Sequence, residues 1–153
     1  MNILMVCLGN ICRSPLAEGI LRDRILKNNL NWKVDSAGTG GWHTGELPDR
    51  RAVKVANSHG IDITDQRARQ LSVDDFSKFD LILAMDSMNF RDILKMAPAA
   101  FDTSKLHLIL DYITPGENAC VPDPYYDGRF EFVYQLLSSA CDKLISQLCY
   151  AKS

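Results

Sequence analysis

Residues 7–14 read Cys-Leu-Gly-Asn-Ile-Cys-Arg-Ser, so a cysteine is followed by five residues, an arginine and a serine. The apolar run 3–6 precedes this segment, and Pro15, which suits the first turn of a helix, follows it. We therefore expect a thiol where a strand ends and an arginine where a helix begins. Gly9 and Asn10 allow backbone conformations closed to most residues, so the turn can point successive N–H groups inward. With the N-terminus of the helix, the segment predicts a phosphate-binding loop with a nucleophile at its floor.

The side chains of Cys7, Arg13 and Ser14 supply what the chemistry of a phosphate ester needs. The planar guanidinium of Arg13 can bind two phosphate oxygens at once, and its charge favours the thiolate form of Cys7. Ser14 can cap the helix, hydrogen-bond the thiolate, or do both. Taken alone, Cys7 would be interpreted as a buried structural thiol and Arg13 as an exposed charge. Taken together, the residues of the loop favour a phosphocysteine intermediate. The loop lacks Gly-Lys-Ser/Thr, so it is not a nucleotide loop of the Walker type.

A general acid for this reaction is available at Asp123, which lies between two prolines. Pro124 drives the preceding residue towards an extended backbone, which stiffens a loop that must deliver one carboxyl group. Asp123 alone would be read as a turn residue, but a thiolate attack on a phosphate ester needs an acid to protonate the leaving group. Tyr125 and Tyr126 provide flat apolar walls, and Trp42 in a glycine-rich loop is interpreted as a rim residue that stacks on an aromatic leaving group.

Taken in order along the chain, these residues resemble the low-molecular-weight protein tyrosine phosphatase family. The segments that carry the resemblance are 6–15, 35–38, 59–61, 68–70, 85–86 and 123–126. They span essentially the whole chain, and residues 6–15 look like the family's signature loop almost without substitution.

The resemblance implies a role for each site residue. Cys7 would be the nucleophile, Arg13 the clamp on the phosphate and the transition state, and Asp123 the general acid and then the general base. The residues that would support the loop or line its entrance are Leu8, Asn10, Ile11, Ser14, Trp42, Tyr125 and Tyr126. No metal and no cofactor is expected. The adjacent tyrosines would be candidates for phosphorylation, as in some family members.

Behind the loop the sequence departs from the family pattern. Gln66 stands where many members carry a histidine that braces the loop from below, so the bracing role passes to His59 or is absent.

Glu18 lies one place late for a capping box at the start of the helix, so no capping box is expected. His43 is expected to be solvated and Arg69 to be a surface charge.

The sequence contains five cysteines, which are odd in number and scattered and so predict no disulfide framework. Cys12 lies inside the loop, either as a small apolar filler or as a resolving thiol that protects Cys7 by forming a disulfide with it. The resemblance favours the second interpretation. A nucleophilic thiol needs a reducing compartment, so we expect the protein in the cytoplasm.

Strand and helix patterns alternate along the chain, which predicts an α/β fold with a parallel sheet covered by helices on both faces. In such doubly wound sheets ligands bind beyond the carboxyl ends of the strands, where the loop after the first strand would lie. The resemblance adds that the sheet has four strands. The predicted strands are 2–6, 34–36, 81–85 and 106–110, and the predicted helices are 15–28, 50–58, 87–97 and 129–149.

Length and composition limit the function classes. The 153 residues suit one domain, residues 1–153, and a formal net charge of −2 gives no electrostatic footprint for nucleic acid. No stretch approaches the roughly 20 apolar residues that span a membrane, and the apolar start is too short for a signal peptide. We expect a monomer or a weak homodimer.

The sequence thus predicts a metal-independent phosphatase that hydrolyses phosphotyrosine in proteins, and small aryl phosphates, through a phosphocysteine. One alternative is an arsenate reductase-like enzyme, which would need further cysteines in the interval between Cys12 and Cys120, where there are none. A second is a non-catalytic phosphotyrosine-binding module, which would be expected to have lost the thiol, the arginine or the acid. A third is a redox-sensing module built on Cys7 and Cys12, which can coexist with catalysis.

Overall fold

A four-stranded parallel sheet forms the centre of the protein. The computed structural model describes residues 1–150, and residues 151–153 of the predicted domain lie outside the described residues. The strands are β1 (Asn2–Cys7), β2 (Lys33–Gly38), β3 (Leu81–Ala84) and β4 (Leu106–Leu108), in the order β2-β1-β3-β4. All neighbouring pairs are parallel, and Cys7 at the end of β1 is in register with Gly38 at the end of β2. The predicted fold class is confirmed.

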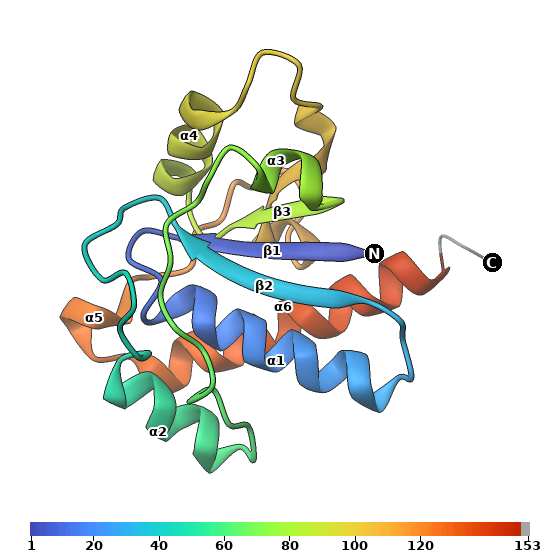
Figure 1. Ribbon diagram of the computed structural model, residues 1–153. Helices are drawn as coiled ribbons and strands as arrows, with labels where there is room; N and C mark the ends of the chain where they lie inside the picture. Colours follow the sequence, from blue (N-terminus) through green and yellow to red (C-terminus); the bar gives the residue numbers. More distant parts are fainter. Residues whose placement is uncertain (151–153) are drawn as a thin grey trace.

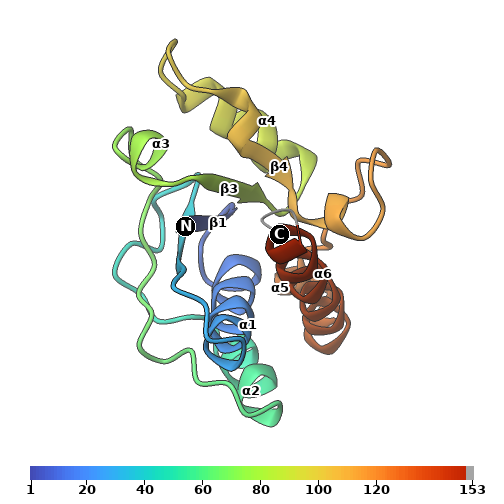
Figure 2. The same ribbon diagram turned by 90° about the vertical axis from the view of Figure 1, so that its right-hand side faces the viewer.

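Helices cover both faces of this sheet (Figures 1 and 2). One face is covered by α1 (Arg13–Lys27) and α6 (Phe130–Tyr150), with α2 (Arg50–Ser58) beyond them, and the other by α3 (Asp75–Lys78) and α4 (Ser87–Met96). Successive side chains of a strand point to opposite faces, so Met5 and Cys7 join the core beneath α1 and α6, whereas Leu4 and Val6 join the core beneath α4. This alternation turns Cys7 towards the start of α1.

The sequence-based boundaries are correct for most elements and wrong at the end of β4, and two short helices were missed. The predicted strand 106–110 ends at Leu108, and the chain continues as a 3-10 helix, Ile109–Tyr112. Ile109 and Leu110 are buried in the 3-10 helix, and an apolar run does not distinguish such a helix from a buried strand. The short helices α3 and α5 (Pro124–Asp127) were not predicted, because four residues are too few to show a helical period.

Connections from separate parts of the chain meet at the carboxyl edge of the sheet. The backbone N–H groups of Thr39 and Gly40 donate to the carbonyls of Cys7 and Leu8, each at 2.9 Å. In the same way Asp49 N donates to Ile11 O at 2.7 Å. The segment after β2 is therefore hydrogen-bonded to the loop after β1 near its start and again at Asp49.

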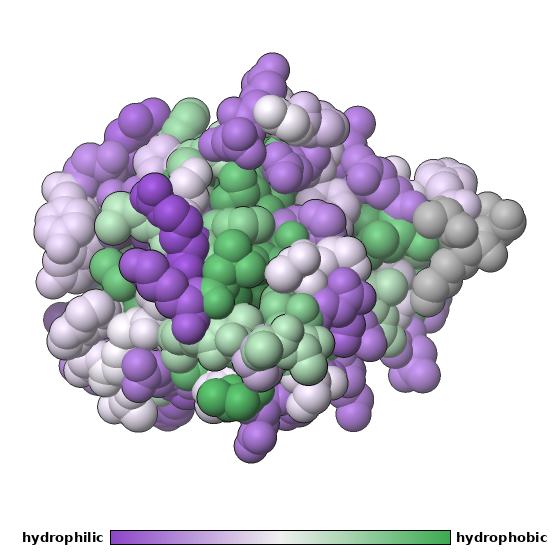
Figure 3. Space-filling view, turned by 90° about the horizontal axis from the view of Figure 1, so that it is seen from above, coloured by the Kyte–Doolittle hydropathy of each residue, from purple (hydrophilic) through white to green (hydrophobic). Residues whose placement is uncertain are grey.

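The surface on the α4 side of the sheet contains both hydrophobic and hydrophilic residues. Viewed from the side of α4, hydrophobic residues show between hydrophilic ones (Figure 3), and Met88 and Leu94 of α4 are among the exposed apolar side chains. Within residues 1–150, no helix is long and apolar enough to cross a membrane.

Candidate active site

The loop between β1 and α1 surrounds the thiol of Cys7. This side chain is 3% exposed, and the backbone N–H of Asn10 donates to its sulfur at 3.2 Å. The hydroxyl of Ser14 lies 3.0 Å from the same sulfur. Asn10 has a φ of 57°, the left-handed conformation that its residue type tolerates and that turns its N–H inward. Two hydrogen-bond donors therefore converge on a buried sulfur, an arrangement that stabilises a thiolate.

Two expectations for this loop are corrected. Gly9 is absent from the residues with positive φ, and what it provides is space, because a Cβ there would lie 3.1 Å from Cδ2 of His43. Ser14 does not cap α1, since the N-cap is Cys12, which makes no side-chain capping bond. The hydroxyl of Ser14 is engaged with Cys7 instead.

Arg13 begins α1 and is buried beneath the loop. Its Nη1 donates to Asp86 Oδ2 at 2.7 Å and to the carbonyl of Val121 at 3.1 Å, while Nη2 lies 3.8 Å from Asp123 Oδ2. Burial alone would lower the pKa of Arg13, but the neighbouring Cys7, Asp86 and Asp123 raise it overall, so the guanidinium stays charged.

Asp86, two residues after the end of β3, makes two interactions. Its Oδ2 accepts from Arg13, and its Oδ1 accepts from the backbone N–H of Asn89 at 2.7 Å, so that it also caps α4. The arginine fork is thereby fixed to the rigid end of a central strand.

Asp123 reaches the pocket from the opposite wall. It has an extended backbone, as its following proline predicts, and is the N-cap of α5, with Oδ1 accepting from Tyr125 N at 3.1 Å. The other oxygen, Oδ2, faces Arg13. With a side chain 32% exposed, the carboxyl group is open to both the pocket and solvent, as an acid that serves a leaving group and then a water must be.

A cavity of about 280 Å³ unites most of the predicted site residues. Its rim is aromatic and exposed, with Trp42 70%, Tyr125 45% and Tyr126 84% accessible to solvent. His43 also lines the cavity, beside Glu46 to which it is hydrogen-bonded, and its side chain is 33% exposed to solvent. The full lining consists of Cys7, Leu8, Gly9, Ile11, Cys12, Arg13, Trp42, His43, Asp123, Tyr125 and Tyr126.

Cys12 lies in the wall of this cavity and is 5% exposed. Burial, together with the negative charge of Asp49 and of Cys7, raises the pKa of the Cys12 thiol well above its usual value. Cys12 therefore remains a neutral thiol under conditions in which Cys7 has donors to hold a thiolate.

The residues behind the loop differ from both alternatives that the sequence offered. Gln66 donates from Nε2 to the carbonyl of Pro15 at 3.1 Å, and its buried Oε1 has no hydrogen-bond partner among the described residues. His59 lies elsewhere, hydrogen-bonded to Glu131 at 2.9 Å and stacked on Tyr134 with ring centroids 3.9 Å apart. His59 therefore does not take over the bracing role.

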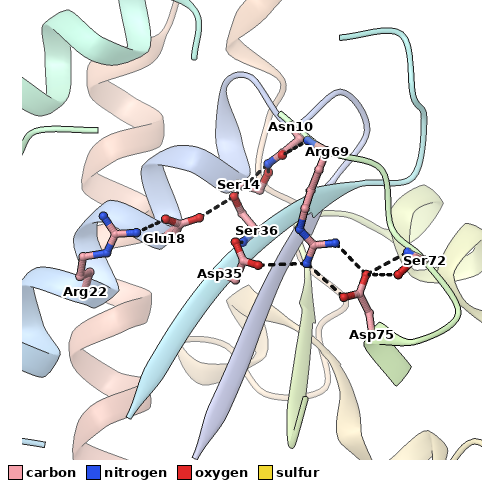
Figure 4. Close-up of polar contacts among 9 residues, drawn as sticks. All are labelled: Asn10, Ser14, Glu18, Arg22, Asp35, Ser36, Arg69, Ser72 and Asp75. Carbon is pink, nitrogen blue, oxygen red and sulfur yellow. Dashed lines mark hydrogen bonds and ion pairs between the residues drawn. The ribbon is translucent and has the colours of Figure 1, made fainter. Parts of the chain in front are cut away.

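Glu18 on the inner face of α1 occupies the place behind the loop, and sequence reasoning missed it. It is 3% exposed, and its Oε1 accepts from Ser36 Oγ at 2.8 Å; that hydroxyl in turn accepts from Asn10 Nδ2 at 3.0 Å (Figure 4). The available signal was a carboxylate four residues after Ser14, on the same side of a helix, within the otherwise apolar stretch 15–21.

Arg69 is likewise more than the surface charge expected. Its guanidinium binds Asp75 at 2.9 Å and Asp35 at 3.1 Å, and its backbone N–H donates to Asn10 Oδ1 at 3.0 Å (Figure 4). The segment that carries Arg69 therefore holds one end of the Asn10 amide. Among residues 1–150, no group of three His, Cys, Asp or Glu side chains is arranged to hold a metal ion.

Comparison with known proteins gives consistent matches along the chain. Residues 2–153 match the family described as low molecular weight phosphotyrosine protein phosphatase. The chain is 44% identical over 149 residues to the low molecular weight protein-tyrosine-phosphatase YfkJ of Bacillus subtilis, covering 96% of this chain and 95% of that protein. The crystal structure of YfkJ matches with a TM-score of 0.93 over 100% of this chain and 97% of that one, at 43% identity. The crystal structure of DARP, a Drosophila arginine phosphatase, matches with a TM-score of 0.90 at 36% identity, over 97% and 98% of the two chains.

Proposed function

We propose a two-step mechanism through a phosphocysteine for this chain, which belongs to the low molecular weight phosphotyrosine protein phosphatase family and is a protein tyrosine phosphatase. In the first step the thiolate of Cys7 attacks phosphorus, and the bond between phosphorus and the tyrosine oxygen breaks. Asp123, carrying a proton, gives it to the leaving phenolate. The products of this step are the dephosphorylated tyrosine and phosphocysteine.

In the second step a water molecule attacks the phosphocysteine. Asp123, now a carboxylate, takes a proton from the water, the S–P bond breaks, and inorganic phosphate leaves with the Cys7 thiolate restored. Arg13 and the N–H groups of residues 8–14 stabilise the charge on the phosphoryl oxygens in both transition states. The proposed reaction uses no metal, because these side chains supply nucleophile, clamp and acid.

One observation carries this mechanism. The sulfur of Cys7, the guanidinium of Arg13 and the carboxyl group of Asp123 line the same cavity, with Arg13 Nη2 only 3.8 Å from Asp123 Oδ2. Phosphoryl transfer needs the nucleophile and the acid on opposite sides of the phosphoryl group, and we propose that Arg13 holds the ester in the cavity in that in-line arrangement.

The rim supports aromatic phosphate esters in proteins as substrates. Trp42, Tyr125 and Tyr126 surround the entrance, and Ile11 adds an apolar surface. A phenyl ring would stack on these walls, whereas a phosphorylated guanidinium, the substrate class named for the Drosophila relative, would leave its polar N–H groups against apolar side chains.

Cys12 is proposed as a resolving thiol. Peroxide would oxidise the Cys7 thiolate to a sulfenic acid with release of hydroxide, and the thiol of Cys12 would displace a second hydroxide, protonated to water, to form a disulfide. Support comes from the position of both cysteines in the wall of one cavity, and Cys12 must lose its proton as it attacks, because the thiolate is the nucleophile.

The setting of the enzyme follows from the same chemistry. We place it in the cytoplasm, where a catalytic thiol stays reduced, acting on tyrosine-phosphorylated proteins as a monomer or weak homodimer. The net charge of −2 provides no attraction for nucleic acid.

The decisive experiment is the hydrolysis of an aryl phosphate by reduced protein in the presence of a chelator, with Cys7→Ser beside it and phosphoarginine as a second substrate. Wild type should hydrolyse the aryl phosphate at a rate that the chelator leaves unchanged. The Cys7→Ser variant should show almost no turnover while it still binds phosphate. Full activity in that variant would overturn the mechanism, and faster release of phosphate from phosphoarginine would overturn the proposed substrate class.

A further inference from the structure

A chain of buried hydrogen bonds joins the carboxyl group of Glu18 to the sulfur of Cys7. Oε1 of Glu18 accepts from Ser36 Oγ at 2.8 Å, and Asn10 Nδ2 donates both to Ser36 Oγ at 3.0 Å and to Ser14 Oγ at 2.8 Å (Figure 4). Ser14 Oγ then lies 3.0 Å from Cys7 Sγ. Each of these five residues is at most 4% exposed. A titratable group that the two-step mechanism does not use is thus in hydrogen-bond continuity with the nucleophile.

The direction of each hydrogen bond in this chain is determined by its neighbours. The backbone N–H of Arg69 can only donate, and it donates to Asn10 Oδ1 at 3.0 Å, so the other end of the Asn10 amide is the NH₂ group. That group donates to both hydroxyls. Since each hydroxyl accepts from Asn10, each has its own proton to give, Ser36 to Glu18 and Ser14 to Cys7. The two ends of the chain are therefore acceptors, the carboxylate of Glu18 at one and the sulfur of Cys7 at the other.

A proton on Glu18 would break this pattern. Its Oε2 faces the guanidinium of Arg22, which can only donate, so an added proton must reside on Oε1 and point at Ser36. The hydroxyl of Ser36 would then receive two hydrogen bonds, and its own proton would have to turn away within a buried site. An unmade hydrogen bond of this kind is costly, and the orientation of Asn10, on which Ser14 depends, would no longer be held from both sides.

The charges around Glu18 bring this change into the neutral range. Burial raises the pKa of Glu18 to about 7, against the lowering effects of the Ser36 hydroxyl and the Arg22 guanidinium. Asp35 on β2 and Asp65 in the segment before Gln66 act in the same direction as burial. The remaining neighbour, Gln66, carries no charge and directs its amide at Pro15. Glu18 therefore has a single cation beside it, Arg22, among the groups that shift its pKa most.

We propose that Glu18 is a positioning residue that acts on Cys7 through Ser36, Asn10 and Ser14. Its carboxylate form holds the loop and the thiolate in their reactive arrangement, and a proton gained by Glu18 loosens that arrangement. The inference rests on the proposed function, because it assigns Glu18 a role in readying the nucleophile of that reaction. It makes the enzyme sensitive to pH in the neutral range through a group outside the cavity.

The test compares pH profiles from pH 5 to 9. Two quantities are measured, kcat/KM for an aryl phosphate and the rate at which iodoacetamide alkylates Cys7. Wild type should show an ionisation near pH 7 in both, with a change of about three- to tenfold, the range expected for the loss of one hydrogen bond. This ionisation should be absent from Glu18→Gln. It should also be absent from Ser36→Ala, which removes the hydrogen bonds that link Glu18 to Asn10 and leaves the ion pair of Glu18 and Arg22 intact.

Further variants separate a positioning role from a structural one. Arg22→Gln should move the ionisation to higher pH, because the guanidinium no longer favours the carboxylate, whereas a merely structural Glu18 would leave the profile in place. Arg22 has a side chain 38% exposed, so this variant reports even where Glu18→Gln does not fold. Glu117→Gln changes an exposed residue that takes no part in the hydrogen bonds between Glu18 and Cys7. It is the control and should match wild type.

The outcomes distinguish this inference from the proposed function. The role of Glu18 would be overturned if wild type is active and the pH profile of Glu18→Gln superimposes on it. It would also be overturned if the ionisation in Arg22→Gln stays at the pH seen in wild type. Either outcome would leave the phosphatase mechanism intact. Inactive, folded and reduced wild type would overturn the mechanism, and the alkylation rates, which need no turnover, would still report whether Glu18 acts on Cys7.

Discussion

The two sides of the loop formed by residues 7–14 carry different kinds of side chains. The front is an open cavity with charged groups from separate elements, Arg13 and Asp123, and an exposed aromatic rim. The back is buried, and its working groups are a neutral amide and two hydroxyls ending at Glu18. The front is suited to binding and transferring a charged group. The back is suited to holding one backbone conformation.

This difference has an energetic reason. The carboxyl group of Asp123 faces the cavity and remains partly solvated until the substrate enters, and the buried guanidinium of Arg13 lines the same cavity, so both can interact with the phosphoryl group in the transition state. Groups behind the loop are desolvated permanently, and each must have its hydrogen bond in the folded protein. Changes to solvated groups at the front, such as Asp123, should therefore reduce turnover with little loss of stability, and changes at the back should reduce both, turnover by less.

The sharpest test of the front is Arg13→Lys. Lysine keeps one positive charge but loses the planar fork that holds Asp86 and the carbonyl of Val121 while facing the phosphoryl site. We expect kcat to fall about a thousandfold or more, the range for loss of an arginine clamp in phosphoryl transfer. Steady-state kinetics with an aryl phosphate, beside thermal unfolding to verify the fold, will check this. A loss of less than tenfold would mean that the loop N–H groups do the work assigned to Arg13.

Asp123→Asn should have the next largest effect at the front. Asparagine is as good an N-cap as aspartate, so α5 should keep its start, but it cannot transfer a proton. We expect kcat to fall about a hundredfold to ten-thousandfold for phenyl phosphate, and less for p-nitrophenyl phosphate, whose leaving group needs less protonation. Asp127→Asn is the matched control and should keep its activity. Asp127 is exposed, lies outside the cavity and accepts a hydrogen bond from the backbone N–H of Arg129. An equal loss with both substrates would argue against Asp123 as the acid.

The front is also the side that the sequence reveals. Cys7 and Arg13 are separated by a short, fixed spacing and flanked by the end of a strand and the start of a helix, so local sequence determines their geometry. Asp123 is more than a hundred residues away, but its two prolines mark it, and the chemistry of the loop requires such a group. The back depends on Ser36 and Arg69, which reach Asn10 only because β2 and the segment before Gln70 pack beside the loop. No local pattern announces those contacts.

The fold shows the same division between local and non-local information. The parallel sheet, with helices on both faces, follows from alternating patterns that are each visible within about ten residues. The end of β4 does not, because Ile109 and Leu110 are as apolar as a strand residue and only their tertiary setting turns them into a 3-10 helix. Gly9 is a similar case, since the side chain that would crowd a Cβ there is His43, from a different connection.

Asn10→Ala tests whether the back fixes the loop. The change removes hydrogen bonds to Ser14, Ser36 and the backbone of Arg69, and it puts alanine at a φ of 57°. We expect the free energy of unfolding to fall by about 2–4 kcal/mol and kcat/KM to fall about ten- to a hundredfold. Urea unfolding and steady-state kinetics will measure both.

Two controls isolate the cause of that change. Asn29→Ala also places alanine at a left-handed position, with φ 53°, but at an exposed site, so it reports the backbone cost alone. Asn10→Gly relieves the backbone and still lacks the hydrogen bonds. Full activity in Asn10→Gly would show that the amide does not position the nucleophile.

Cys12→Ser probes the wall between front and back. After mild peroxide and then a dithiol, wild type should recover most of its activity, because the disulfide protects Cys7 from further oxidation. Cys12→Ser should recover several-fold less, since its sulfenic acid proceeds to the irreversible sulfinic acid. Cys120→Ser, an exposed cysteine outside the cavity, should recover like wild type. Equal recovery by Cys12→Ser and wild type would exclude the resolving role.

The smallest effect expected, and the most specific to the back, is on the pH dependence of stability. The pKa of Glu18 is raised from 4.5 to about 7 on folding, so between these values the folded state holds a proton that the unfolded state has released. Stability relative to Glu18→Gln should therefore be greatest below about pH 4.5 and fall as pH rises to about 7, by about 3 kcal/mol in total, and stay level above. Urea unfolding of both proteins from pH 4.5 to 8 will measure this difference. Parallel curves would mean that Glu18 is ionised throughout and that burial does not control its charge, and the back of the loop would then have a fixed hydrogen-bond pattern in place of one that changes near neutral pH.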